Sequence, residues 1–110
     1  MNTLMPHLLV VDDHPGNRLA IRKQLRIMPV QVLEAASGPQ ALKMLLDHDV
    51  FLVLLDVDMP GMDGFEVAEA ISQVQRTAHI PIILLTAAFK DRHHHLRGYE
   101  CGAVDYLEKP

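Results

Sequence analysis

The chain has 110 residues, which is enough for one domain with one core and too few for two. Apolar residues make up 49% of the chain, a composition typical of a globular protein and not of a disordered one. Lys and Arg total 10 against 14 Asp and Glu, so the formal charge is −4, and the absence of a basic patch argues against direct binding to nucleic acid.

Nothing in the sequence has the pattern of a membrane or export segment. Apolar runs such as LLVV and FLVLL are far shorter than the roughly 20 residues that span a bilayer. The first residues lack the charged and then apolar pattern of a signal peptide. Cys101 is the only cysteine, which excludes an internal disulfide and fits a reducing compartment. We therefore expect a cytoplasmic domain without a membrane segment.

Apolar runs of strand length alternate with stretches whose apolar residues have helical spacing. In chain order the sequence predicts a strand over 7–11, a helix over 15–28, a strand over 30–35, a helix over 38–49, a strand over 51–55, a helix over 64–75, a strand over 80–86, a helix over 89–102 and a strand over 103–107. This alternation, with short connections, predicts an α/β fold with a doubly wound parallel sheet and right-handed crossovers.

Local signals mark where the helices begin. Pro15 suits the first turn of the first helix, which Asp13 or His14 can cap. Ser37 and Asp63 precede the second and third helices as N-cap residues. The apolar face of the first helix is predicted to contain Asn17, Ile21, Leu25 and Met28.

The predicted fifth strand ends almost at the last residue of the chain. A fifth strand in such a sheet normally leads into a helix that covers one face of the sheet. We therefore expect residues 1–110 to form one domain that is a fragment of a longer protein.

Polar residues follow the ends of the predicted strands, where open α/β sheets bind their ligands. The residues concerned are Asp12 and Asp13, Asp56 with Asp58 two positions on, Thr86, and Lys109. Parallel strands share a direction, so these groups are expected at one edge of the sheet. If the first and third strands are neighbours, their carboxylates converge.

Converging carboxylates repel one another, so they either take up protons or bind a cation. Oxygen ligands with room for water suit Mg²⁺, whereas no EF-hand spacing favours Ca²⁺, and Zn²⁺ would require His or Cys ligands. A carboxylate beside Mg²⁺, with a lysine and a hydroxyl opposite, is an arrangement for phosphoryl transfer. In this interpretation Asp56 is the nucleophile, Lys109 offsets charge on the phosphoryl oxygens, and Thr86 donates a hydrogen bond to one of them.

Four motifs, VVDDHPGNR, LLDVDMPGMDGFEV, IPIILLTA and GAVDYLEKP, together resemble the receiver domain of two-component response regulators. The resemblance covers Leu8 to Pro110. It implies a flavodoxin-like (CheY-like) fold with five strands in the order 2-1-3-4-5, in which the last helix is missing from this chain. It also implies a switch that a histidine kinase or a histidine phosphotransfer domain phosphorylates, and that acts on an output domain or effector protein.

The same resemblance assigns roles to individual residues. Asp56 matches the phosphoacceptor, Asp12 and Asp13 match the acidic pair that holds Mg²⁺, and the backbone carbonyl of Asp58 matches a further metal ligand. The switch pair is Thr86 with Tyr106, Lys109 matches the family's lysine, and the Lys109–Pro110 bond resembles its cis peptide. The motifs are most similar to receivers of hybrid histidine kinases or cyclic-di-nucleotide signalling proteins.

Two other functions stay open on the sequence alone. The DVD motif resembles that of haloacid-dehalogenase-type phosphohydrolases, but there it ends the first strand, and here it ends the third. A receiver-like interaction module that is never phosphorylated usually lacks an acidic or lysine position, and here all are present. His14 lies beside the acidic pair, and we expect it to line the pocket without acting.

Overall fold

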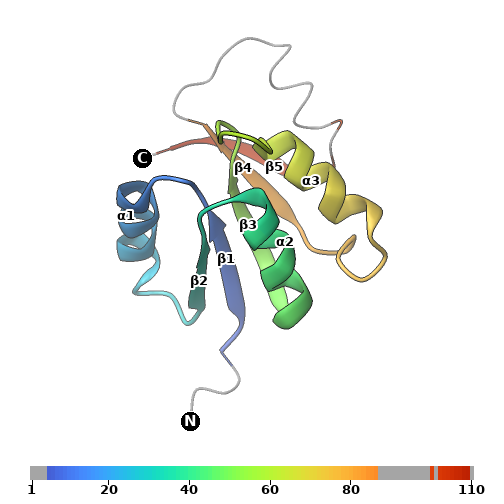
Figure 1. Cartoon of the computed structure of the whole chain (residues 1–110). Helices are drawn as coiled ribbons and strands as arrows, with labels where there is room; N and C mark the ends of the chain where they lie inside the picture. The colour runs from blue at the N-terminus through green and yellow to red at the C-terminus, as the bar shows by residue number, and fades with distance from the viewer. Residues whose placement is uncertain (1–4, 87–99, 101, 110) are drawn as a thin grey trace.

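The computed structural model describes residues 5–86, 100 and 102–109. These residues contain a five-stranded parallel sheet in the order β2-β1-β3-β4-β5, which confirms the predicted fold class and strand order (Figure 1). The strands are β1 (His7–Val11), β2 (Gln31–Ala35), β3 (Val50–Asp56), β4 (Ile82–Thr86) and β5 (Asp105–Glu108). The helices are α1 (Pro15–Leu25), α2 (Gly38–Asp47) and α3 (Gly64–Gln73).

Two predictions fall outside the described part of the chain. The helix predicted over 89–102 lies almost wholly in residues 87–99 and 101, and the Lys109–Pro110 bond involves residue 110. Both therefore stay predictions. Within the described residues, no helix is long and apolar enough to cross a membrane.

The three described helices begin where the sequence predicts and end earlier. The α1 helix stops at Leu25, and the amide of Met28 bonds back to the Leu25 carbonyl in a tighter turn. The α3 helix stops at Gln73 because Val74 adopts an extended backbone. Met28, which was predicted to extend the apolar face of the first helix, is 49% exposed, and Val74, which follows α3, is 48% exposed.

Side-chain caps fix two of the three helix starts. The Ser37 hydroxyl accepts a hydrogen bond from the Gln40 amide at 3.3 Å. At α3, the Asp63 carboxylate accepts from the Glu66 amide at 2.9 Å, and the Glu66 carboxylate accepts from the Asp63 amide at 3.1 Å, a complete capping box.

The predicted cap of α1 is wrong. His14 occupies the N-cap position, but its side chain makes no capping hydrogen bond, and Asp13 does not cap the helix either. The reason is that the ring of His14 lies against the Asp13 carboxylate, 3.3 Å from it. Pro15 at the helix start lacks an amide hydrogen, so the first turn has one donor fewer to satisfy.

Buried apolar side chains lie on both faces of the sheet, and the cluster on one face is larger than that on the other. On the face that α2 and α3 cover, Leu9, Leu55 and Leu84 are fully buried. The other face packs against α1, where Val10 and Ile21 are buried. The strands alternate their side chains between these faces, and the carboxyl ends of all five strands meet at one edge of the sheet (Figure 1).

Candidate functional site

Two buried carboxylates lie side by side at the carboxyl edge of the sheet. Val11 pairs with Leu55 in the β1–β3 register, so Asp12 and Asp56 are the next neighbours on adjacent strands. Each of the two aspartates is only 1% exposed. The sequence predicted this convergence on the condition that the first and third strands are neighbours, and they are.

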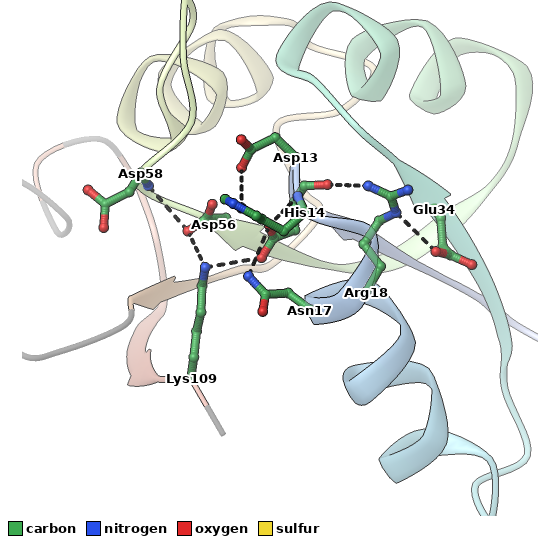
Figure 2. A network of polar contacts seen from close by, with 9 residues as sticks. Asp13, His14, Asn17, Arg18, Glu34, Asp56, Asp58 and Lys109 are labelled. Carbon is green, nitrogen blue, oxygen red and sulfur yellow. Dashed lines mark hydrogen bonds and ion pairs between the residues drawn. The ribbon is translucent and has the colours of Figure 1, made fainter.

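The ammonium group of Lys109 lies between these two carboxylates. Its Nζ is 2.9 Å from Asp56 Oδ1 and 3.1 Å from Asp12 Oδ2, and the side chain is 13% exposed (Figure 2). The Lys109 amide also donates to the Thr86 carbonyl at 2.6 Å, so the segment after β5 is held against the end of β4. The structure therefore brings together the residues that the sequence placed after three different strands.

Burial and charge shift the pKa values of this group. Burial raises the pKa of Asp56 above its ordinary 3.8, and the neighbouring Asp12 charge adds to the rise, while the hydrogen bond from Lys109 opposes it. Burial alone would lower the pKa of Lys109, but its contacts with Asp56 and Asp12 outweigh this and raise it. The contacts with two carboxylates thus favour the charged form of Lys109, whereas burial disfavours the charged form of Asp56.

The remaining carboxylate oxygens fit an oxygen-binding divalent cation. Asp56 Oδ2 is buried, and among the described residues it has no hydrogen-bond or ion-pair partner. Asp13 is 24% exposed and lies beside Asp12, so it adds a second accessible carboxylate. Unpaired buried oxygens beside further carboxylates are the ligand set that Mg²⁺ prefers, with positions left for water. The residues present therefore fit the predicted ion.

Asp58 contacts the site through its backbone. Its amide donates to Asp56 Oδ1 at 3.2 Å. Figure 2 shows its carboxylate turned away from Asp56 and Lys109, and the residue is exposed. The side chain therefore does not belong to the buried cluster, and the role of the Asp58 carbonyl as a metal ligand stays a prediction.

Thr86 and Tyr106 contact each other on the neighbouring strands β4 and β5. Thr86 is fully buried and Tyr106 is 5% exposed. Burial raises the pKa of Tyr106, and a hydrogen bond with Thr86 partly offsets this rise. The predicted switch pair is thus in direct contact, with the tyrosine ring inside the protein.

Two arginines, Arg18 and Arg22, form a network next to Asp12 that the sequence did not predict. Arg18 Nη1 donates to the Asp12 carbonyl at 2.7 Å, and its Nε donates to Glu34 at 3.0 Å (Figure 2). Arg22 binds the other oxygen of Glu34 at 2.8 Å. Arg18 is 17% exposed, so its fork of donors joins α1, β2 and the main chain of Asp12 in a partly dry environment.

Gly64 is a second position whose importance the sequence did not reveal. Its amide donates to the Val57 carbonyl at 3.1 Å, just beyond Asp56. A Cβ atom at this glycine would lie 2.7 Å from Val57 Cα and in closer contact with the Asp56 carbonyl oxygen. The start of α3 therefore packs directly on the backbone that carries Asp56, and this packing requires a residue without a side chain.

Comparison with known proteins gives the family. Residues 8–110 match the response regulator receiver domain. The chain is 42% identical over 103 residues to a probable cyclic di-GMP phosphodiesterase of Vibrio cholerae, covering 94% of this chain and 23% of that protein. It is 39% identical over 114 residues to the sensor histidine kinase GacS of Pseudomonas protegens, covering 100% of this chain and 12% of the kinase.

A solved structure has the same fold. The response regulator TrrA of Thermotoga maritima, in complex with Mg²⁺ and BeF, superposes with a TM-score of 0.83 at 34% identity and covers 96% of this chain and 88% of that one. The chain spans less than half the length of the curated relatives that it matches. From the family match, the strand order and the carboxylates at the strand ends, the chain belongs to the response regulator receiver domain family.

Proposed function

We propose that this chain is a phosphorylation-dependent signalling switch that accepts a phosphoryl group on Asp56. The observation that carries the proposal is the buried Asp56 carboxylate, with Lys109 at 2.9 Å on one oxygen and no partner in the described residues on the other. A carboxylate with one oxygen neutralised and the other available is suited to nucleophilic attack. The family and its relatives in two-component systems support a signalling switch of this kind.

The donor is a phosphohistidine of a histidine kinase or of a histidine phosphotransfer domain. An Asp56 oxygen forms a bond to phosphorus as the bond between phosphorus and the histidine nitrogen breaks, and the histidine ring keeps the electron pair. Lys109 stays paired with the acceptor and offsets charge on the transferred group. Asp12, Asp13, Asp56 and the backbone carbonyl of Asp58 would hold Mg²⁺, which would supply positive charge to the phosphoryl oxygens.

The conformational response involves Thr86 and Tyr106. The two residues are already hydrogen-bonded, and the Thr86 carbonyl accepts a bond from the Lys109 amide. A phosphoryl group on Asp56 offers new acceptor oxygens to the Thr86 hydroxyl. If Thr86 turns toward them, Tyr106 loses or remakes its bond, and the surface around β5 changes. An output domain or effector protein reads this change.

The parent protein is proposed to be a hybrid histidine kinase or a cyclic-di-nucleotide enzyme that works in the cytoplasm, with this domain as its non-enzymatic receiver. Relatives of both types match nearly the whole chain. The sheet face over β3, β4 and β5 supports a further packing segment, because Leu54 and Ile83 are only partly buried and Leu107 is 44% exposed. A helix that packs on this face would complete the core.

The decisive experiment is intact-mass measurement after incubation with acetyl phosphate and Mg²⁺. We expect one added phosphoryl group on the chain and none on Asp56→Asn. Labelling that survives Asp56→Asn would overturn the assignment of the acceptor. Steady turnover of a phosphomonoester would instead indicate a hydrolase, and a chain that never labels would indicate an interaction module.

A further inference from the structure

The imidazole of His14 lies over the acidic pair. Its Nδ1 is 3.3 Å from Asp13 Oδ1 and 3.8 Å from Asp12 Oδ1 (Figure 2). Among the described residues, Asp12, Asp13 and His14 are the only group of three His, Cys, Asp or Glu side chains whose potential ligand atoms lie within 4.8 Å of one another. A nitrogen donor thus belongs to a cluster that otherwise contains only oxygen.

The backbone holds His14 in this position. Its amide donates to Asp12 Oδ1 at 2.9 Å, and its φ of −96° and ψ of 117° are extended. Pro15 follows, and a residue before proline is restricted to this extended region. The side chain is 70% exposed, so the ring can move toward an ion without displacing packed neighbours.

The observed spacing suits shared coordination of one ion. Two ligand atoms that each lie about 2.1 Å from one ion are about 3.0–3.4 Å apart at octahedral or tetrahedral angles. The 3.3 Å between His14 and Asp13 falls in this range, and the 3.8 Å to Asp12 needs a shift of a few tenths of an ångström. Asp56 lies outside this group of three, and its buried, unpaired Oδ2 is a further candidate oxygen ligand at the same edge of the sheet.

We propose that His14 is a ligand that shifts the metal preference of this site from Mg²⁺ toward first-row transition ions such as Mn²⁺ and Ni²⁺. The proposal rests on the metal site of the proposed function. Mg²⁺ prefers oxygen and gains little from imidazole. Affinity for nitrogen donors rises from Mn²⁺ to Ni²⁺, so a single histidine favours the later ion more strongly. His14 therefore biases the acidic site toward ions that bind nitrogen strongly.

The test is isothermal titration calorimetry of Mg²⁺, Mn²⁺ and Ni²⁺ with the chain and with His14→Ala. Consecutive histidines bind Ni²⁺ themselves, so every variant carries alanine at His93, His94 and His95. His7→Ala is the matched control, because His7 contacts Gln31 at the opposite edge of the sheet. Circular dichroism checks that each variant is folded.

We expect His14→Ala to weaken Ni²⁺ binding about tenfold or more, Mn²⁺ binding less, and Mg²⁺ binding by no more than about threefold. His7→Ala should change none of the three. If His14→Ala weakens Mg²⁺ and Ni²⁺ binding by the same factor, or leaves Ni²⁺ binding unchanged, the proposal is overturned, whereas the proposed phosphorylation switch is not affected. A chain that does not label on Asp56 with acetyl phosphate and Mg²⁺ would instead contradict the proposed function.

Discussion

Replacing Lys109 with methionine removes the cation that two buried carboxylates share. Its Nζ lies 2.9 Å from Asp56 and 3.1 Å from Asp12, and both aspartates are 1% exposed. Methionine keeps the length and the apolar stem of the side chain, so the change is mainly one of charge. We expect the free energy of unfolding to fall, because the carboxylates stay buried and lose their counter-charge.

The size of the loss follows from these distances. At about 3 Å and an effective dielectric constant of about 20, each contact is worth roughly 5 kcal/mol before the burial of the ammonium group is subtracted. Breaking a buried pair by removing one partner typically costs about 3–5 kcal/mol. Asp56 can take up a proton to relieve part of this loss, so we expect a net decrease of about 3 kcal/mol at neutral pH without metal.

The dependence on pH has a definite sign. Without Lys109, the pKa of Asp56 rises further above its ordinary 3.8, because the hydrogen bond that opposes the rise is gone. The folded state then binds more protons than the unfolded state between that value and the raised pKa, so stability decreases as pH rises. The deficit of Lys109→Met is therefore largest at neutral pH and shrinks as the solution is acidified toward the ordinary value.

Urea denaturation measures the loss of stability in Lys109→Met. Far-ultraviolet circular dichroism follows the unfolding, since the chain has no tryptophan for a fluorescence signal. Lys43→Met is the matched control, because Lys43 is an exposed lysine of α2. Saturating Mg²⁺ should restore more stability to Lys109→Met than to the unchanged chain. Removing one carboxylate as well, in Asp56→Asn/Lys109→Met, should recover part of the loss. A deficit below about 1 kcal/mol, the size for exposed pairs, would refute the reasoning.

Three further predictions use the same denaturation assay. Asp56→Asn should raise the free energy of unfolding at neutral pH without metal, because the raised pKa of Asp56 means that folding disfavours its ionised carboxylate. The gain in stability should vanish below pH 3.8, and a variant that is less stable at neutral pH would contradict this prediction. Gly64→Ala should lose about 1–3 kcal/mol, because its Cβ meets the backbone of Val57, whereas Gly16→Ala, with open space, should lose nothing. Arg18→Met should lose about 1–3 kcal/mol of unfolding free energy and weaken Mg²⁺ binding, because Arg18 bonds to the Asp12 carbonyl. Arg22→Met is the control: Arg22 is 56% exposed, so this variant should lose under about 1 kcal/mol and leave Mg²⁺ binding unchanged.

The sheet and the convergence at its edge could be predicted because they depend on patterns that repeat along the chain. Apolar runs separated by amphipathic stretches define strands and helices, and parallel strands must end at the same edge. That rule puts Asp12, Asp56 and Lys109 at the same edge, and the order of the strands decides which of them are neighbours. The strand order came from the resemblance to a family, since the alternation of strands and helices does not determine it.

The rest depends on contacts that no local pattern encodes. Asn17 has the spacing of an apolar helix face, yet its side-chain amide donates to the Asp12 carboxylate at 3.4 Å. The sequence suggests that Arg18 is an ordinary surface residue of a helix, yet its guanidinium donates to the Asp12 carbonyl. Gly64 reads as part of a turn, yet α3 packs there against the backbone of Asp56. Each role depends on a neighbour that only the folded chain supplies.

The position of Lys109 links charge at Asp56 to the strands that the proposed switch uses. A phosphoryl group would raise the negative charge at residue 56, one of the two groups that face the Lys109 ammonium, from −1 to about −2. The amide of the same lysine is bonded to the Thr86 carbonyl at 2.6 Å, and Thr86 is bonded to Tyr106. A shift of the lysine toward a larger charge therefore acts on the ends of β4 and β5 together. Because Thr86 and Tyr106 are buried and closely packed, we expect them to rearrange between discrete states and not to deform gradually.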